Sequence, residues 1–405
     1  MLHRITLMAN SAEPSTARQK FDLADVSIAL VAGFGLSITA LFLCVLPFSH
    51  DVYGSRDFVS YWATGQQLLQ HRNPYNMDEI AALEHAAHLD PRATLIMRNL
   101  PFALPLAYVF GVLGLRLAAI LWSPFLLGCL IVCVLLVRRL HGSPPGYAHW
   151  LGLAFFPALL CITMGQTSIL LLLGLVLFLT WHRSHPFAAG AALWLCILKP
   201  HIFLPFAVVL LAWIFVSRSY RVLGGAVVAG AIGAALTTAL DPQAWSQYAF
   251  YMRTSSITHE FTPCWGDLLR DKINPAAQWL AYIPAIIGCI WALAYFWRRR
   301  RIWNWLEHGS PIILVSLLVA PFGWIFDQSV AIPALLHGAF VLRSRILITI
   351  LAGLILITDF QIYFVQLTSP MWLWTAPAWL AWYACARNSA RKAEATQIVS
   401  AVPLS

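Results

Sequence analysis

The sequence predicts an all-α fold of the polytopic integral membrane class, with long outer loops. Of the 405 residues, 60% are hydrophobic and only 11% are charged, whereas soluble domains contain roughly 45 to 50% apolar residues. The mean hydropathy of +0.72 is equally high. The apolar residues also gather in runs that approach the roughly 20 residues a helix needs to cross a bilayer. This composition leaves no room for a separate soluble domain.

About twelve apolar segments follow one another along the chain, which predicts about twelve transmembrane helices. They cover residues 26–47, 100–137, 148–164, 167–181, 186–198, 202–216, 222–240, 276–297, 310–326, 328–342, 346–366 and 370–386. We expect residues 1–25 to form a cytoplasmic N-terminal tail, residues 26–386 a multi-span membrane domain, and residues 387–405 a cytoplasmic C-terminal tail. The long outer loops are expected at about residues 48–99 and 241–275.

The basic residues predict how these segments are oriented. If residues 100–137 form one crossing, with a Pro-containing first half that is re-entrant or interfacial, the basic groups of the later loops share one side with both termini. These groups are Arg138/Arg139, Arg183, Arg218/Arg221, Arg298–Arg301, Arg343/Arg345 and Arg387/Arg391/Lys392. The positive-inside rule makes that side cytoplasmic. Two full crossings within residues 100–137 would turn the Arg298–Arg301 cluster outward, so we reject them.

The acidic residues collect on the opposite side, in the two outer loops. They are Asp51, Asp57, Asp78, Glu79, Glu84, Asp90, Asp241, Glu260, Asp267 and Asp271. Several apolar segments, such as residues 186–198, are short, which predicts helices that stop below the outer surface and leave a cavity. Polar side chains are tolerated at membrane depth where they line such a cavity. We therefore expect a site that faces outward from the inner (cytoplasmic) membrane.

Composition and missing motifs exclude several classes of function. The net charge of +9 comes from short basic runs between apolar segments, which suit anionic lipid and not nucleic acid. Seven of the eight cysteines lie within apolar runs, so no disulfide framework is predicted. The chain has no GxxxxGK[ST], HExxH, CxxC or G-x-S-x-G motif, and no D-x-D beside Asp57. We predict no metal and no other cofactor.

The most distinctive polar segment is Arg56–Tyr75, directly after the first apolar run. If it is helical, Asp57 and Tyr61 share one face, and Phe58 and Trp62 share the next. One interpretation makes Asp57 a general base for an acceptor hydroxyl, with the aromatic rings stacking on a sugar or a lipid headgroup. The other makes it a solvated loop acid beside interfacial aromatics.

Shorter polar interruptions carry the remaining candidates. Gly165-Gln166-Thr167 is either a plain turn or a place where the Gln166 amide binds a sugar hydroxyl. Lys199 runs against the positive-inside trend, which calls for a phosphate or carboxylate partner unless the side chain snorkels. Asp327 lies either in a tight hairpin turn or in a site. Asn73-Pro74-Tyr75 and Asn99-Leu100-Pro101 read best as turns.

Taken in order, several motifs resemble glycosyltransferase family 87, also known as the DUF2029 family. They are RDFVSYW…NPY, NLPFALPLAYVF, GQTSILLLLGLVLF, LKPHIFLPFAVVLL and APFGWIFDQ, and the resemblance extends over roughly residues 50–345. It implies a GT-C-like fold and an inverting transfer of a hexose, typically mannose. The implied donor is a polyprenyl-phosphate sugar, and the implied acceptor is a lipid or glycan at the outer face of the cytoplasmic membrane.

The resemblance also implies roles for single residues. Asp57 matches the family's acid in the first outer loop and would act as the base, while Gln166 matches the family's GQ and Lys199 its KP. The chain departs from the family at Asn99-Leu100-Pro101, where Tyr-Pro-Pro is common, and at Asp327-Gln328, where a His often occurs.

The mechanism that we expect is a single displacement in which Asp57 deprotonates the acceptor and cations receive the leaving phosphate. The candidates are Asp57 as catalytic base; Lys199, His201, Arg98 and Arg253 for the donor phosphate; and Tyr61, Trp62, Gln166 and Asp327 for the substrate. Membrane lipids are the other expected partners. The alternatives are a lipid or glycan transporter or flippase, and a non-catalytic membrane subunit of a glycan export system.

Overall fold

A computed structural model describes residues 23–48, 56–90, 95–144, 146–254, 261–341 and 344–401. Over these residues the chain is helical and contains no strand, as its composition predicts. Most of the expected tail at residues 1–25 lies outside the described residues. So do Asp51, Glu260 and Arg343.

The first half of the described chain alternates α-helices with short 3-10 helices. Its elements are α1 (Leu23–Val45), η1 (Leu46–Phe48), α3 (Phe58–Leu69), α4 (Met77–Ala86), η2 (Pro101–Ala103), α5 (Leu104–Leu113), α6 (Leu115–Leu140), η3 (Ala148–Leu153), α7 (Phe156–Met164), α8 (Ser168–Trp181), α9 (Pro186–Ala192), η4 (Leu193–Leu198), η5 (Pro200–Phe203) and α10 (Leu204–Ser217).

The second half continues in the same way. Its elements are α11 (Tyr220–Leu240), α12 (Ala244–Thr254), α13 (Trp265–Ile273), η7 (Gln278–Tyr282), α14 (Ile283–Arg299), η8 (Arg300–Ile302), α15 (Trp305–Leu318), η9 (Ile325–Ala331), α16 (Ile332–Val341), α17 (Arg345–Gln361), η10 (Pro370–Trp372) and α18 (Thr375–Ala401).

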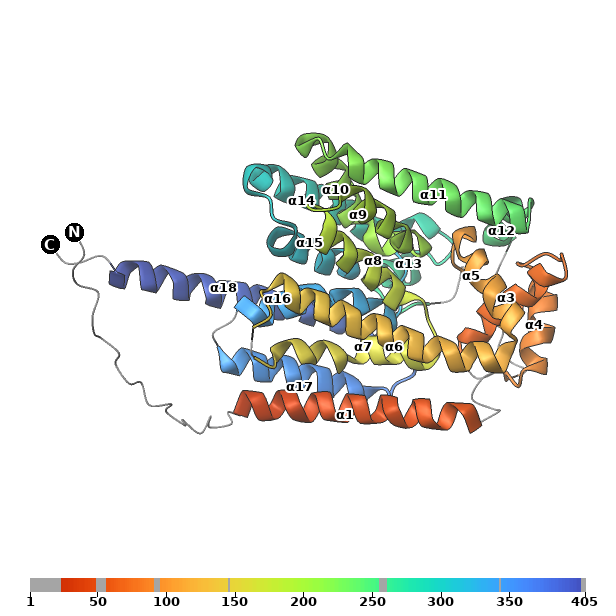
Figure 1. The fold of residues 1–405 in the computed structure, drawn as a ribbon, viewed down its shortest axis with the longest axis horizontal. Helices are drawn as coiled ribbons and strands as arrows, with labels where there is room; N and C mark the ends of the chain where they lie inside the picture. Colours follow the sequence, from red (N-terminus) through yellow and green to blue (C-terminus); the bar gives the residue numbers. More distant parts are fainter. Residues whose placement is uncertain are drawn as a thin grey trace, which may run out of the picture.

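The long helices form a bundle with two distinct ends (Figure 1). Helices α1, α6, α17 and α18 run along the long axis of the molecule. Helices α3, α4, α5 and α12 gather at the right-hand end of the figure, which we call the α3–α5 end. Helix α1 begins and α18 ends at the opposite end. We call it the basic end, because the last turns of α6 and α14 carry paired arginines there.

Helix α8 lies in the interior of this bundle. Ten of its fourteen residues are buried, and they lie on every side of the helix. A helix that is apolar all round belongs in a core, whereas a helix with an apolar outer face can meet lipid. Helix α11 illustrates the second kind, since Val227, Ile232 and Leu236 are more than half exposed. The eight cysteines are free thiols.

Only some of these helices are long enough to cross a bilayer alone. Five described segments reach the necessary length and apolarity: Val26–Phe48, Leu115–Leu140, Pro200–Ser217, Tyr220–Leu240 and Gln278–Ile302. Six other apolar helices are shorter, with 10 to 17 residues. The structure thus supports a multi-pass membrane protein, and the expected number of about twelve full spans is not confirmed.

Two sequence boundaries can be compared directly with the helices. The predicted segment 100–137 divides at Gly114, whose φ of 75° ends α5 before the long helix α6 begins. This break leaves one long helix, α6, after the short helix α5. Of the two alternatives for Asp327, the structure excludes the tight hairpin turn. The chain turns between α15 and Trp324, and Asp327 lies inside η9, which leads straight into α16.

Candidate active site

The site begins at the junction that precedes α3. Arg56 is buried, and its guanidinium donates hydrogen bonds to the carbonyls of Ile162 and Thr163 and to Ser123 Oγ. The two carbonyls belong to the last turn of α7, where backbone acceptors lack helical partners and a cation is favourable. Burial lowers the pKa of Arg56 to about 10, and neighbouring Asp57 opposes the change. Arg56 is therefore still charged at neutral pH and fixes the start of α3 to α7.

The turn after α7 places an amide beside Asp57. Gly165 adopts a left-handed conformation with φ of 73°, and a Cβ there would lie 2.6 Å from the Cβ of Phe58. Only glycine meets both requirements. The next side chain, Gln166, then reaches the carboxylate, and its Nε2 donates to Asp57 Oδ2 over 2.8 Å.

Gln166 also connects Asp57 to other polar groups. Its Oε1 lies 3.1 Å from the Tyr61 hydroxyl and 3.4 Å from Lys199 Nζ. The Tyr61 hydroxyl is equally close to Asn99 Oδ1, at 3.1 Å. Asp57 and Tyr61 therefore lie on one face of α3, as the i, i+4 spacing predicts, and both contact the same amide.

A second acid completes this chain of contacts. Lys199 Nζ donates to Asp327 Oδ1 over 2.7 Å, and the two side chains are only 11% and 4% exposed. Ser168 Oγ donates to the same oxygen, and the Trp324 amide donates to Asp327 Oδ2. Both oxygens of Asp327 are thus occupied. We call the connected residues Asp57, Tyr61, Gln166, Lys199 and Asp327 the polar chain.

The surroundings of Asp57 favour its protonated form. Burial raises the pKa of this carboxyl above its ordinary value, against the hydrogen bond from Gln166 and the charges of Lys199, Arg56 and Arg98. The residue itself is still partly exposed. Burial also raises the pKa of the Tyr61 phenol, which keeps its proton for donation. A carboxylate held this way is a better proton acceptor than an exposed aspartate.

Four predicted residues lie outside the polar chain. Arg98 is exposed, yet near enough for its charge to act on Asp57. His201 follows Lys199 by two positions, and its ring lies against Phe322 with centroids 6.4 Å apart. Trp62 packs against the core, and its indole nitrogen has no hydrogen-bond partner among the described residues. Arg253 is exposed on α12.

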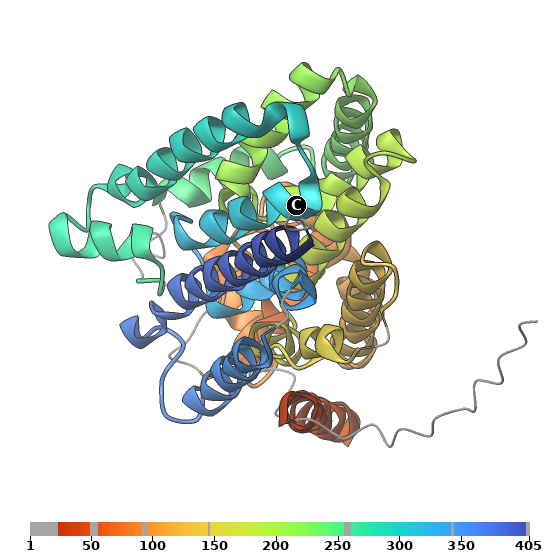
Figure 2. The same cartoon turned by 90° about the vertical axis from the view of Figure 1, so that its left-hand side faces the viewer.

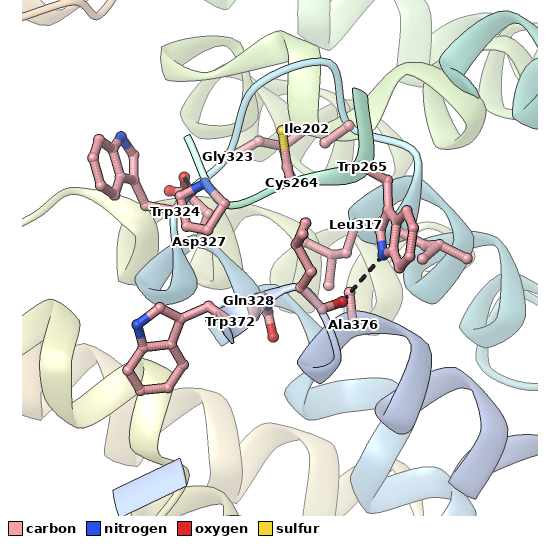
Figure 3. Close-up of a pocket in the computed structure, with 14 residues that line it drawn as sticks. Ile202, Cys264, Trp265, Leu317, Gly323, Trp324, Asp327, Gln328, Trp372 and Ala376 are labelled. Carbon is pink, nitrogen blue, oxygen red and sulfur yellow. Dashed lines mark hydrogen bonds between the residues drawn. The ribbon is translucent and has the colours of Figure 1, made fainter. Parts of the chain in front are cut away.

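A small pocket opens beside the polar chain at Asp327 (Figure 3). Three tryptophans, Trp265, Trp324 and Trp372, contribute to its lining. Trp265 comes from α13, and its indole donates a hydrogen bond to the Leu373 carbonyl over 3.1 Å. The segment 241–275, which the sequence predicts as an outer loop, therefore contributes to the walls of the site. Indole rings offer flat apolar faces on which sugar rings can stack.

Sequence reasoning missed three residues that hold the polar chain in place. Asn99 was read as a turn residue, but its side chain is buried and donates to the Leu198 carbonyl, next to Lys199. Ser168 and Arg56 were not considered as site residues. The position of Ser168 directly after the Gly165-Gln166-Thr167 turn, and that of Arg56 directly before Asp57, could have indicated them. Within the described residues, no group of three or more His, Cys, Asp or Glu side chains has a geometry that could hold a metal ion.

These features define a multi-pass membrane protein with a buried polar site where short helices end inside the bundle. The chain belongs to glycosyltransferase family 87, whose family model matches residues 100–321. It is therefore a membrane glycosyltransferase. The matched range is narrower than the expected 50–345. It contains Gln166 and Lys199, while Asp57 precedes it and Asp327 follows it. No curated protein and no solved structure matches the chain.

Proposed function

We propose that this glycosyltransferase moves a hexose, mannose being the first choice, from a polyprenyl-phosphate donor to a lipid or glycan acceptor, with inversion at the anomeric carbon. One observation carries the proposal: the Gln166 amide contacts both Asp57, a base, and Lys199, a cation. A transfer from a lipid phosphate needs a proton acceptor and a group that stabilises the leaving phosphate, held close together.

The reaction is a single displacement. Asp57 takes the proton of the acceptor hydroxyl as the oxygen forms its bond to the anomeric carbon. The bond from that carbon to the phosphate oxygen breaks, and its electron pair stays on the lipid phosphate. The raised pKa of Asp57 makes this carboxylate the stronger base.

Lys199 is the group that we assign to the leaving phosphate. Its 2.7 Å bond to Asp327 holds the ammonium in place, whereas its contacts to Gln166 and Ser168 are longer, at 3.4 Å each. A phosphate oxygen can replace these long contacts without breaking the short one. Asp327 then acts through Lys199 and positions it. Arg98 lies near enough for its charge to act on Asp57, and His201 lies near Asp327 and Lys199. Arg253 is exposed on α12, and nothing connects it to the polar chain in this proposal.

The site belongs, in this proposal, to the outer face of the cytoplasmic membrane. The polar chain connects to α3, which lies at the α3–α5 end, away from the basic end (Figure 1). Basic residues favour the cytoplasmic side, so the α3–α5 end faces outward. A polyprenyl-phosphate sugar can approach this end from the lipid itself.

Transfer of radiolabelled mannose from polyprenyl-phosphate-mannose to a membrane lipid extract tests the proposal. The purified wild type should transfer label, and Asp57→Asn should transfer about 100- to 10,000-fold less, which is the usual contribution of a general base. Asp57→Asn should fold at least as stably at neutral pH, because it removes a charge whose burial is unfavourable. Asp78→Asn on α4 is the matched control, since Asp78 is an exposed acid of the same end.

The outcomes separate the parts of the proposal. Full activity in Asp57→Asn would overturn the assignment of the base and leave the donor standing. If the wild type transfers another hexose from the same lipid phosphate, only the choice of mannose is wrong. If no sugar is transferred from any polyprenyl phosphate, the donor class is wrong, and lipid or glycan transport becomes the function to test.

A further inference from the structure

A groove runs along the outside of the bundle between α14, α15 and α18. Its residues are distant in sequence from Asp57, the proposed catalytic base. Its lining residues are Ile287, Gly288, Trp291, Tyr295, Arg299, Glu307, Pro311, Val315, Val319, Leu380, Tyr383, Ala384, Arg387, Asn388 and Arg391. We call it the α14–α18 groove. Figure 2 looks at the basic end and shows α14 in teal and α18 in dark blue, on the same side of the molecule.

The groove is apolar over most of its length. Pro311 and Val315 of α15 and Val319, directly after it, follow one another at intervals of four residues and so lie along one face. From Glu307 to Val319 this face is about 18 Å long at 1.5 Å per residue. One leaflet of a bilayer contributes half of a hydrocarbon core of roughly 30 Å, or about 15 Å. The length of the groove therefore suits a fatty acyl chain in one leaflet.

The opposite wall is also suited to an acyl chain. Helix α14 contributes Ile287, which is 62% exposed, and Trp291, whose ring stacks on Tyr295 with centroids 5.2 Å apart. Such large exposed apolar side chains face lipid tails in a membrane protein. On α18 the corresponding residue is Leu380.

The basic end of the same groove is positively charged. Arg299, Arg387 and Arg391 line it, and Glu307 is the only acid among its lining residues. Arg387 is paired with Glu307 over 2.5 Å, while the Arg299 guanidinium lies 4.1 Å from the centre of the Tyr295 ring. Three positive charges against one negative charge leave a net charge of about +2 where the groove ends.

We propose that the α14–α18 groove binds a membrane phospholipid with a net negative headgroup. Its acyl chain lies along the apolar stretch, and its phosphate lies between Arg299 and Arg391. Charge complementarity selects the headgroup, because basic pockets between membrane helices on the cytoplasmic side attract anionic lipids. The apolar length selects a lipid over a soluble anion. This site is separate from the proposed transfer reaction and does not depend on it.

Native mass spectrometry of the purified full chain tests this site with two probes that have identical acyl chains, phosphatidylglycerol and phosphatidylcholine. The wild type should bind phosphatidylglycerol more tightly. Arg299→Gln with Arg391→Gln should weaken that binding about 25-fold, at about fivefold for each arginine, and should leave phosphatidylcholine nearly unchanged. If the double variant does not fold, Arg391→Gln alone serves as the test, because Arg391 is exposed. It should weaken phosphatidylglycerol binding about fivefold.

Two controls separate the headgroup from the chain. Arg139→Gln with Arg221→Gln removes two exposed arginines of α6 and α11 that do not line the groove, and should leave binding unchanged. Val315→Trp fills the apolar part and should weaken both phospholipids. Equal binding of the two phospholipids to the wild type, or unchanged phosphatidylglycerol binding in the arginine variants, would overturn the proposal. Competition by soluble glycerophosphoglycerol as strong as by the lipid would show an anion site and would also overturn it.

Discussion

The Asp57 carboxyl must lose its proton before it can act as a base, and its raised pKa sets the pH at which this happens. Below that pKa the carboxyl is neutral and cannot accept a proton. The transfer rate should therefore fall on the acid side with an apparent pKa above the ordinary value of 3.8 for aspartate. A pH–rate profile of the wild type measures it. An acid limb at or below 3.8 would contradict the assignment.

Arg98 provides a second test of the same group. Its charge lowers the pKa of Asp57, so Arg98→Gln should move the acid limb to higher pH. Arg253→Gln removes another exposed charge, on α12, and should not move the limb. The two variants differ in position and not in chemistry, and so a shift in both would indicate a general effect of charge.

Lys199 can be tested for a role beyond neutralising Asp327. Lys199→Gln should lower transfer by about 100- to 1,000-fold, as expected for the loss of one group that stabilises the transition state. It should also lower stability by about 3 to 5 kcal/mol, because it leaves Asp327 buried without its cation. Adding Asp327→Asn removes that second effect. The double variant should recover thermal stability but not transfer, and recovery of both would make Lys199 purely structural.

The sequence alone indicated some residues of the site and missed others. Gln166 and Lys199 interrupt apolar runs, so they were visible as polar residues at membrane depth. The structure joins Gln166 to Asp57, 109 positions away in the sequence, and Lys199 to Gln166, 33 positions away. Asn99 was misread because a turn signal and a buried hydrogen-bonding role use the same residue type. Only the fold distinguishes the two.

At the scale of elements, the contact between α9 and α11 depends on two glycines. A Cβ on Gly225 would lie 1.9 Å from the Phe187 carbonyl oxygen, and one on Gly190 would lie 1.9 Å from the Val222 carbonyl oxygen. Small residues allow membrane helices to approach this closely. Because the obstacles are backbone atoms, a larger residue must push the helices apart.

This packing gives a prediction with an internal control. Gly225→Ala should destabilise the protein by about 1 to 3 kcal/mol through overpacking. Gly230→Ala on the same helix has nothing within 4 Å of the new Cβ and should be neutral or stabilise by up to about 1 kcal/mol through helix propensity. Thermal unfolding in detergent measures both. A similar loss for the two variants would contradict the close approach.

The order of helices was easier to predict than their ends. Hydropathy located the apolar segments because each one becomes helical. It misplaced the turn near Asp327. The helices are interrupted at Ala320–Trp324, and the Pro, Gly and aromatic residues of this segment keep the run apolar, so hydropathy does not detect the interruption. Asp327 looked like an interruption, although its carboxylate accepts the Trp324 amide and so caps the first turn of η9.

At the scale of the whole molecule, the proposed orientation can be measured on intact cells. The test requires a background in which Cys44, Cys289 and Cys385 are serine, since these thiols are not buried. Asp78→Cys on α4 should then react with a membrane-impermeant maleimide from outside. Arg301→Cys at the basic end should react only after lysis. The reverse pattern would turn the site to the cytoplasmic side.

Composition was sufficient to predict the membrane class but not the number of spans. A hydropathy run reports apolar residues, and it cannot distinguish a helix that crosses the bilayer from one that stops inside the protein. Helices α7 and α8 show the difference, because the chain turns at Gly165–Thr167 within the bundle. The two short helices thereby leave the space in which Gln166 meets Asp57.

Arg56 and Asp57 also have a mechanical consequence. Adjacent in sequence, they bind two places only a few residues apart, the last carbonyls of α7 and the side chain of Gln166. The base and its amide partner are thus both held at the end of α7 and the turn that follows it. A lipid that enters between Asp57 and Lys199 cannot spread the site on that side. We therefore expect any widening of the site to occur on the opposite side, where Lys199 lies between two short 3-10 helices, η4 and η5.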